Sequence, residues 1–234
     1  MTTLTIVSVF PELFGTYGDV GNVLVLERRL AWRGIPVEVV PVSVAQPFPT
    51  SGDLYVFGGS EDEAQERALV ALRSSHLSQT VEAGAHLFGV CAGLQVLGRT
   101  FQGGDGEVHE GMGLLDATTT RLDRRVVGEV VAVFNEQIGL PRLTGFANHG
   151  GGTELGPGAS PLAKTVAGRG NDGRPGGPEG AVQGRVVTTY LHGPVLARNP
   201  AFADWLLERV LGTPLEPLPP GPSEALHAER TALA

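Results

Sequence analysis

A single cysteine lies in a segment whose spacing suits nucleophilic chemistry. Gly89-Val-Cys-Ala-Gly-Leu-Gln95 follows an apolar run and opens a helical pattern, so Cys91 sits at the centre of a G-x-C-x-G elbow. The flanking glycines permit a tight turn, and the dipole of the following helix favours the thiolate. The backbone N–H of Ala92 is a candidate oxyanion donor, and that of Gly59 is a second. A free cysteine is more often an inert core residue, but this setting favours a nucleophile.

A cysteine nucleophile normally works with a histidine base, and two of the six histidines are candidates. His192, in Thr188-Thr-Tyr-Leu-His-Gly-Pro194, lies at the C-terminal end of an expected strand, where active sites of open α/β sheets gather. His149, in Phe146-Ala-Asn-His-Gly-Gly-Gly152, competes with it, although its glycines also suit an ordinary turn. We expect the other four to be structural or surface residues: His76, His86, His109 and His227.

Strands that alternate with helices in the first hundred residues predict an α/β fold. We expect a mostly parallel sheet with helices on both faces, followed beyond Phe101 by additional antiparallel strands. The expected strands are Leu4–Phe10, Val37–Val42, Asp53–Phe57, His86–Val90, Arg125–Phe134, Thr144–Ala147, Leu162–Val166 and Val186–Leu191. The expected helices are Val23–Arg33, Glu61–Leu77, Ala92–Leu97 and Ala201–Leu211.

The domain organisation is expected to be simple. Residues 1–212 would form one domain, and residues 213–234 a Pro-rich C-terminal tail that is loosely held or docks on a partner. The segment Gly168–Gly184 is expected to be an exposed, mobile loop because of its glycine content.

The composition excludes several classes of protein. The formal net charge of -8 argues against a nucleic-acid surface, and one cysteine cannot form an intramolecular disulfide. The spacing of cysteine and histidine predicts no zinc site, so no metal is expected. The start of the chain lacks a basic signal-peptide region, and no apolar run reaches about 18 residues. These features predict a cytoplasmic protein.

The elbow and the strand-end histidine together resemble the class I (triad-type) glutamine amidotransferases. Typical members place a glutamate two residues after the histidine, whereas this chain has His192-Gly-Pro194, as in the CobB/CobQ-like, cobyric-acid-synthase-like branch. Three further motifs resemble the GatD-type glutaminase subunits of lipid II isoglutaminyl synthase: Tyr17-Gly-Asp-x-Gly-Asn22, Gly145-Phe-x-Asn-His-Gly-Gly151 and Tyr190-Leu-His-Gly-Pro194. The resemblance runs from about Leu4 to about Leu211.

This resemblance implies an activity and a partner. Such a subunit hydrolyses L-glutamine to glutamate and ammonia, and the Mur-ligase-like subunit MurT uses the ammonia to convert D-glutamate of the lipid II stem peptide to D-isoglutamine. The chain itself would need no cofactor, because ATP and magnesium are expected on the partner, and it would form a heterodimer with no membrane span of its own.

The resemblance also implies roles for individual residues. Cys91 would be the nucleophile and His192 the general base. Arg125 matches the arginine thought to hold glutamine, although Arg121 and Arg124 are close neighbours and a solvated strand-end charge weighs equally. Gln95, in the elbow motif, is a further substrate-binding candidate beside Gly59 and Ala92.

The missing glutamate leaves His192 without an obvious orienting acid. The partner subunit or a backbone carbonyl could fill that role, and the resemblance favours the partner. Asp19 and Asn22 are expected to act locally, by bonding backbone and capping helices, with a place in the ammonia path or partner interface as the weaker alternative. Three acidic residues are expected only as first-turn charges of a helix: Glu61, Asp62 and Glu63.

The sequence leaves two alternative functions open and disfavours two others. The chain could serve a different ATP-dependent amide ligase, or it could be a cysteine hydrolase of the DJ-1 or peptidase type. A cobyric acid synthase would need a large ATP-binding domain, for which 234 residues leave no room. A non-catalytic paralogue is disfavoured by the intact elbow and by His192.

Overall fold

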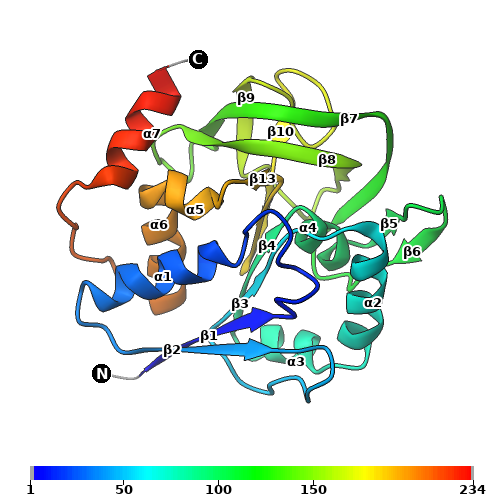
Figure 1. Ribbon diagram of the computed structural model, residues 1–234, viewed down its shortest axis with the longest axis horizontal. Helices are drawn as coiled ribbons and strands as arrows, with labels where there is room; N and C mark the ends of the chain where they lie inside the picture. Colours follow the sequence, from blue (N-terminus) through cyan, green and yellow to red (C-terminus); the bar gives the residue numbers. More distant parts are fainter. Residues whose placement is uncertain (1–2, 233–234) are drawn as a thin grey trace.

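Two β-sheets organise the chain, and the computed structural model describes residues 3–232 (Figure 1). The first sheet has six strands in the order β11-β12-β4-β3-β1-β2. All neighbours in it are parallel except β11, which runs antiparallel to β12 at the edge. Its strands are β1 Leu4–Val9, β2 Val37–Val42, β3 Leu54–Phe57, β4 His86–Val90, β11 Ala181–Gln183 and β12 Val186–Thr189.

Helices cover both faces of this sheet, as the sequence predicts. On one face α1, α5 and α6 pack together, and on the other α4 contacts β4 and β12 and carries α2 (Figure 1). The central strands β3 and β4 are therefore buried along their whole length, which explains their nearly continuous apolar sequence. The helices are α1 Gly21–Ala31, α2 Asp62–Arg73, α3 Leu77–Glu82, α4 Ala92–Leu97, α5 Val195–Arg198, α6 Pro200–Leu211 and α7 Pro222–Ala232.

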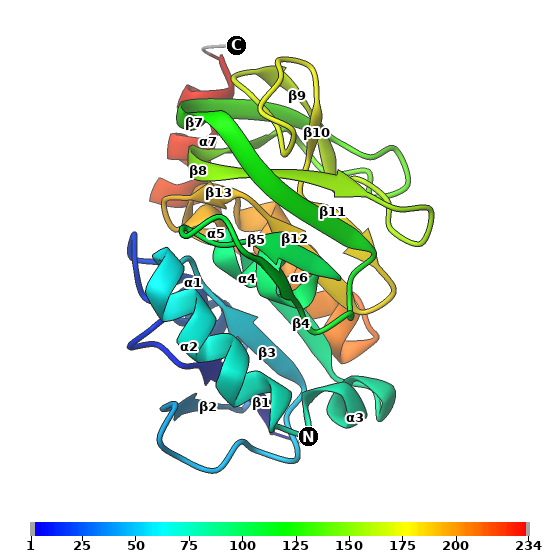
Figure 2. The same ribbon diagram turned by 90° about the vertical axis from the view of Figure 1, so that its right-hand side faces the viewer.

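The second sheet contains the antiparallel strands expected beyond Phe101. Figure 2 shows its two long strands, β7 and β8, crossing the top of the molecule above the six-stranded sheet. The expected strands Arg125–Phe134 and Thr144–Ala147 are parts of these longer strands. The strands are β5 Thr100–Gln102, β6 Val108–Glu110, β7 Ala117–Phe134, β8 Leu143–Leu155, β9 Ala163–Ala167, β10 Pro178–Glu179 and β13 Leu191–His192.

The expectation of an exposed, mobile loop at Gly168–Gly184 is wrong. Asn171 and Glu179 are fully buried, and the segment includes the whole of β10 and β11. The side-chain amide of Asn171 donates to the carbonyl of Gly180 and accepts from its N–H at 2.9 and 2.7 Å. These two bonds satisfy the backbone that glycine-rich composition would otherwise leave to solvent.

Two other segments differ from the expected pattern. The expected helix Glu61–Leu77 is interrupted at Ser74, so that α2 ends at Arg73 and α3 starts at Leu77. The C-terminal tail contains α7, which packs against α5, α6 and β8 of the same chain. Its His227 ring contacts the carbonyl of Arg142 at 2.5 Å. Residues 233–234 of the tail lie outside the described part of the chain.

The carboxyl ends of β1, β3, β4 and β12 meet at one edge of the first sheet, below β8 and β13. The chain leaves β1 towards β2 on one side and reaches β3 on the other, which makes this edge a topological switch point. Within residues 3–232 no helix has the length and apolar character needed to cross a bilayer.

Candidate active site

Cys91 lies at the turn between β4 and α4, as the elbow motif predicts. It has φ 52° and ψ −103°, a backbone conformation that non-glycine residues rarely adopt. A Cβ added to Gly93 would lie 2.8 Å from Cβ and 2.9 Å from the carbonyl oxygen of Phe57, so only glycine fits this close approach of α4 to β3. The thiol is buried, and it lines a pocket at the edge of the sheet.

His192 is held by a carboxylate of its own chain. Its Nδ1 lies 2.8 Å from Oδ2 of Asp19, in the loop after β1, and both side chains are buried. The expectation that the histidine lacks an orienting acid within the chain is therefore wrong, and so is the purely local role expected for Asp19. The fold supplies this partner because the β1 loop and the end of β13 meet at the same edge of the sheet.

The surroundings of His192 favour its protonated form. Burial by itself would lower the pKa, but the hydrogen bond with Asp19 and the electrostatic interaction with Cys91 outweigh it and raise the pKa of His192 to about 10. Nε2 is buried and has no hydrogen-bond partner among the described residues. Cys91 and His192 are thus neighbours, and an imidazolium beside a thiolate is the pair that cysteine hydrolases use.

The backbone N–H of Gly59 is not available as the second oxyanion donor that the sequence predicts. Its N–H donates to Oδ2 of Asp19 at 2.8 Å, so it is already engaged and is not free to bind an oxyanion. A Cβ at this position would lie 2.7 Å from Cε1 of His192, so the glycine makes room for the imidazole. Ala92, in contrast, is the first residue of α4, whose leading N–H groups have no acceptor within the helix.

His149 lies beside the same pocket but in a different electrostatic setting. It belongs to β8, not to a turn, and its ring stacks on Tyr190 with centroids 4.0 Å apart. Nδ1 contacts the carbonyl of Gly151 at 2.7 Å, which requires a proton on Nδ1. Burial lowers the pKa of His149 to about 4, with nearby His192 and Arg125 acting in the same direction. His149 is therefore neutral at pH 7 and has no carboxylate partner, unlike His192.

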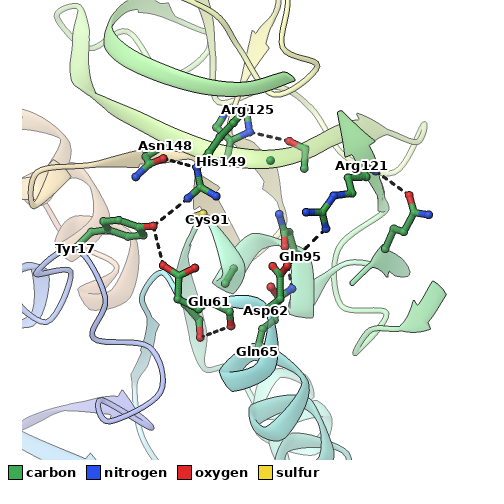
Figure 3. A pocket seen from close by; sticks show the side chains of 15 residues that line it. Tyr17, Glu61, Asp62, Gln65, Cys91, Gln95, Arg121, Arg125, Asn148 and His149 are labelled. Atoms are coloured by element: carbon green, nitrogen blue, oxygen red, sulfur yellow. Dashed lines mark hydrogen bonds and ion pairs between the residues drawn. The ribbon is translucent and has the colours of Figure 1, made fainter. Parts of the chain in front are cut away.

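Arg125 reaches the pocket from an irregularity in β7. The register with β8 shifts between Arg121 and Val126, and such bulges re-aim side chains. Figure 3 shows the Arg125 guanidinium beside Cys91, where it donates to Oδ1 of Asn148 at 2.6 Å and to the hydroxyl of Tyr17 at 3.0 Å. Both partners are neutral, so the positive charge is not cancelled by a direct ion pair. Arg121, by comparison, lies 3.6 Å from a carboxylate oxygen of Asp62.

Gln95 lines the pocket, but its amide is engaged on both ends. Its oxygen accepts from Gln65 at 2.8 Å, and its nitrogen donates to the hydroxyl of Tyr190 at 3.1 Å. The Tyr190 hydroxyl also contacts Thr153 at 2.7 Å, so these groups form a buried network between α2, α4 and β8. Its role in substrate binding stays a prediction.

The acidic residues near the pocket divide into two kinds. Asp62 and Glu63 lie in the first turn of α2, as expected. Glu61 is the N-cap residue, but its side chain makes no cap hydrogen bond and accepts instead from the hydroxyl of Tyr17 at 2.9 Å. Asn22 bonds backbone at a helix N-terminus, as expected, but the helix is distant in sequence and the role is not local. Its Oδ1 accepts from the N–H of Leu196, in the first turn of α5.

The four remaining histidines lie outside this pocket. His86 is in β4 and His227 is in α7, while His76 precedes α3. His109 on β6 stacks on Phe101. Within the described residues, one group has donor atoms close enough to hold a metal ion, all within 4.8 Å of one another: Glu66, Asp105 and His109. None of the three lines the pocket with Cys91.

Sequence reasoning missed two residues that support His192. Asp19 lies in the motif Tyr17-Gly-Asp-x-Gly-Asn22, but nothing in its spacing shows that it meets a histidine 173 positions away. Glu179 is fully buried, and its Oε1 accepts from the Thr189 hydroxyl at 2.7 Å and from the Tyr190 N–H at 2.8 Å. It thereby fixes the bend that precedes His192. Burial raises the pKa of Glu179 to about 7.

Known proteins resemble this chain in sequence and in fold. Residues 5–200 match the model of the CobB/CobQ-like glutamine amidotransferase domain. The chain is 32% identical to the lipid II isoglutaminyl synthase (glutamine-hydrolyzing) subunit GatD of Staphylococcus aureus, over 93% of this chain and 89% of that protein. It is 30% identical to the protein of the same description from Streptococcus pneumoniae, over 89% and 80% of the two chains.

A solved structure described as a glutamine amidotransferase shares the fold. It superposes with a TM-score of 0.60 at 23% identity, covering 87% of this chain and 98% of its own.

Proposed function

This chain belongs to the CobB/CobQ-like family of glutamine amidotransferases, and on that premise we propose that it is the glutaminase subunit of a two-component lipid II amidating enzyme. It hydrolyses L-glutamine to glutamate and ammonia. A Mur-ligase-like partner of the MurT type binds ATP and magnesium and uses the ammonia to amidate D-glutamate of the lipid II stem peptide. The reaction takes place in the cytoplasm, on a membrane-bound acceptor that this chain does not itself contact.

The observation that carries this proposal is the grouping of Cys91, His192 and Asp19 at one sheet edge, with the unpaired charge of Arg125 in the same pocket. A thiolate and an imidazolium suit attack on a carboxamide, and a free guanidinium suits the carboxylate of an amino acid. A peptidase or a DJ-1-type hydrolase has no need of that cation.

The first half of the reaction forms a thioester. The Cys91 thiolate attacks the side-chain amide carbon of glutamine, and the N–H of Ala92 stabilises the oxyanion. The imidazolium of His192 then gives its Nε2 proton to the leaving nitrogen, the carbon–nitrogen bond breaks, and ammonia departs. Asp19 keeps the other ring nitrogen protonated and fixes the ring orientation.

The second half releases glutamate. His192, now neutral, removes a proton from water, and the resulting hydroxide attacks the thioester carbon. The carbon–sulfur bond breaks, Cys91 returns as the thiolate, and His192 returns as the imidazolium. The new carboxyl group loses its proton to solvent and leaves as glutamate. No oxidant or cofactor is consumed in these steps.

The test is ammonia release from L-glutamine by the full-length chain, alone and with a co-purified partner. Cys91→Ala is expected to release none, and Cys91→Ser almost none. Wild-type ammonia release by Cys91→Ala would overturn the mechanism. Recovery of an amide ligase other than a Mur-ligase-like protein would keep the glutaminase but change its acceptor.

A further inference from the structure

Two opposite charges converge on one hydroxyl group at the rim of the pocket. The hydroxyl of Tyr17 donates to Oε1 of Glu61 at 2.9 Å and accepts from Nη2 of Arg125 at 3.0 Å. Figure 3 shows both charged side chains reaching this oxygen, close to Cys91. All four residues line the same pocket.

The buried thiol and the two exposed charges of the pocket match the two ends of a glutamine molecule. Cys91 is buried, whereas Arg125 and Glu61 are exposed, and all three line the same pocket. A substrate whose carboxamide reaches the buried thiol can therefore present its other end to these two exposed charges. That end of L-glutamine carries an α-carboxylate and an α-ammonium on a single carbon atom.

Neither charge is neutralised by an ion pair within the described part of the chain. Within the described residues, Glu61 and Arg125 form no direct ion pair with each other or with another side chain, whereas Asp62 is paired with Arg121. Glu61 also leaves the N-terminus of α2 uncapped, although the N-cap is where its carboxylate would find backbone donors. A role in the pocket explains the placement of the Glu61 side chain better than a role in capping α2.

We infer that Glu61 is a specificity-determining residue that binds the α-ammonium of L-glutamine while Arg125 binds the α-carboxylate, with Tyr17 holding both side chains in position. This inference rests on the proposed glutaminase function. It predicts that the enzyme selects free α-amino acids over carboxamides that lack the amino group.

Two ligands distinguish the role of Glu61 from the role of Arg125. 4-Carbamoylbutanoate has the carboxylate and the carboxamide of glutamine but carries no ammonium group. Binding of each ligand is measured by titration calorimetry with the full chain in the Cys91→Ala background, so that neither is turned over. Glu61→Gln is expected to weaken L-glutamine binding by about 10- to 100-fold, the usual value of a charge-assisted hydrogen bond, and to leave 4-carbamoylbutanoate binding unchanged.

Two matched variants complete the design. Arg125→Gln is expected to weaken both ligands, because both carry the carboxylate. Glu63→Gln makes the same charge change two residues along the chain, outside the pocket, and is expected to leave both ligands unaffected.

The outcomes that would overturn the inference are specific. Equal weakening of both ligands by Glu61→Gln would mean that Glu61 only supports Tyr17, and no weakening would remove it from the site. Failure of the proposed function looks different: the Cys91→Ala chain would bind neither ligand and the unsubstituted chain would release no ammonia, which overturns both proposals together.

Discussion

Nδ1 of His192 lies 2.8 Å from Oδ2 of Asp19, although 173 positions of the chain separate the two residues. The same carboxylate oxygen accepts the N–H of Gly59, so one buried aspartate joins the loops after β1 and β3 to the end of β13. The chain thus contains the acid that orients its histidine.

Replacing this acid tests whether it acts in the reaction. Asp19→Asn is expected to lower kcat for ammonia release by roughly 10³- to 10⁴-fold, because the amide cannot stabilise the imidazolium or hold the correct tautomer. Circular dichroism checks that the fold is retained. If the partner subunit supplied the acid, Asp19→Asn would recover full activity in the complex, and that result would contradict the role of Asp19.

The two histidines His192 and His149 are expected to occupy opposite protonation states. The pKa of His192 is raised to about 10 and that of His149 is lowered to about 4, so neither ring titrates between pH 6 and 8. Ring ¹⁵N spectra should show two protonated nitrogens for His192 and one bare nitrogen for His149 across that range. In Asp19→Asn the His192 resonances should begin to titrate at lower pH. A His149 ring that is charged at pH 7 would contradict this assignment.

Glu179 is expected to make stability depend on pH. Its pKa is raised from 4.5 to about 7 by burial, so its protonated form favours the folded state. The stabilisation of the folded state by protonated Glu179 is fully present below pH 4.5, decreases as the pH rises, and is lost above about pH 7. Glu179→Gln keeps a neutral carbonyl acceptor. At pH 8 its free energy of unfolding, measured by urea denaturation, should exceed that of wild type by roughly 2–3 kcal/mol, with little difference at pH 5.

The control for Glu179 is an exposed glutamate of β8. Glu154→Gln should change the free energy of unfolding by less than about 0.5 kcal/mol at either pH, as surface substitutions usually do. An equal response of both variants to pH would contradict the effect of burial.

The close contact beneath the elbow predicts a steric penalty. Gly93→Ala places a methyl group 2.8 Å from Phe57 and is expected to cost about 1–3 kcal/mol of unfolding free energy. Gly150→Ala adds the same methyl group where no atom lies within 4 Å and should be nearly neutral. Thermal unfolding of the two variants measures the difference, and equal midpoints would show that α4 has room to move away from β3.

Local patterns in the sequence determined the elbow and the parallel strands of the first sheet, but not its edge strand β11. Alternating apolar strands and amphipathic helices are short-range features, so β2, β4 and α4 were predicted with their observed bounds. Cys91 and Arg125 were identified from their motifs and lie in one pocket. The family assignment also followed from motifs, and the comparisons confirm it.

Only the tertiary structure decided which side chains meet. Asp19 joins His192, and Gly59 donates to Asp19 and not to an oxyanion, because the carboxyl ends of four strands converge at one edge. The glycine-rich segment before β12 was expected to be mobile, because composition reports backbone freedom but not the buried bonds of Asn171. Spacing along a chain encodes local conformation, whereas the contacts of a buried carboxylate depend on segments that fold together from distant parts of the sequence.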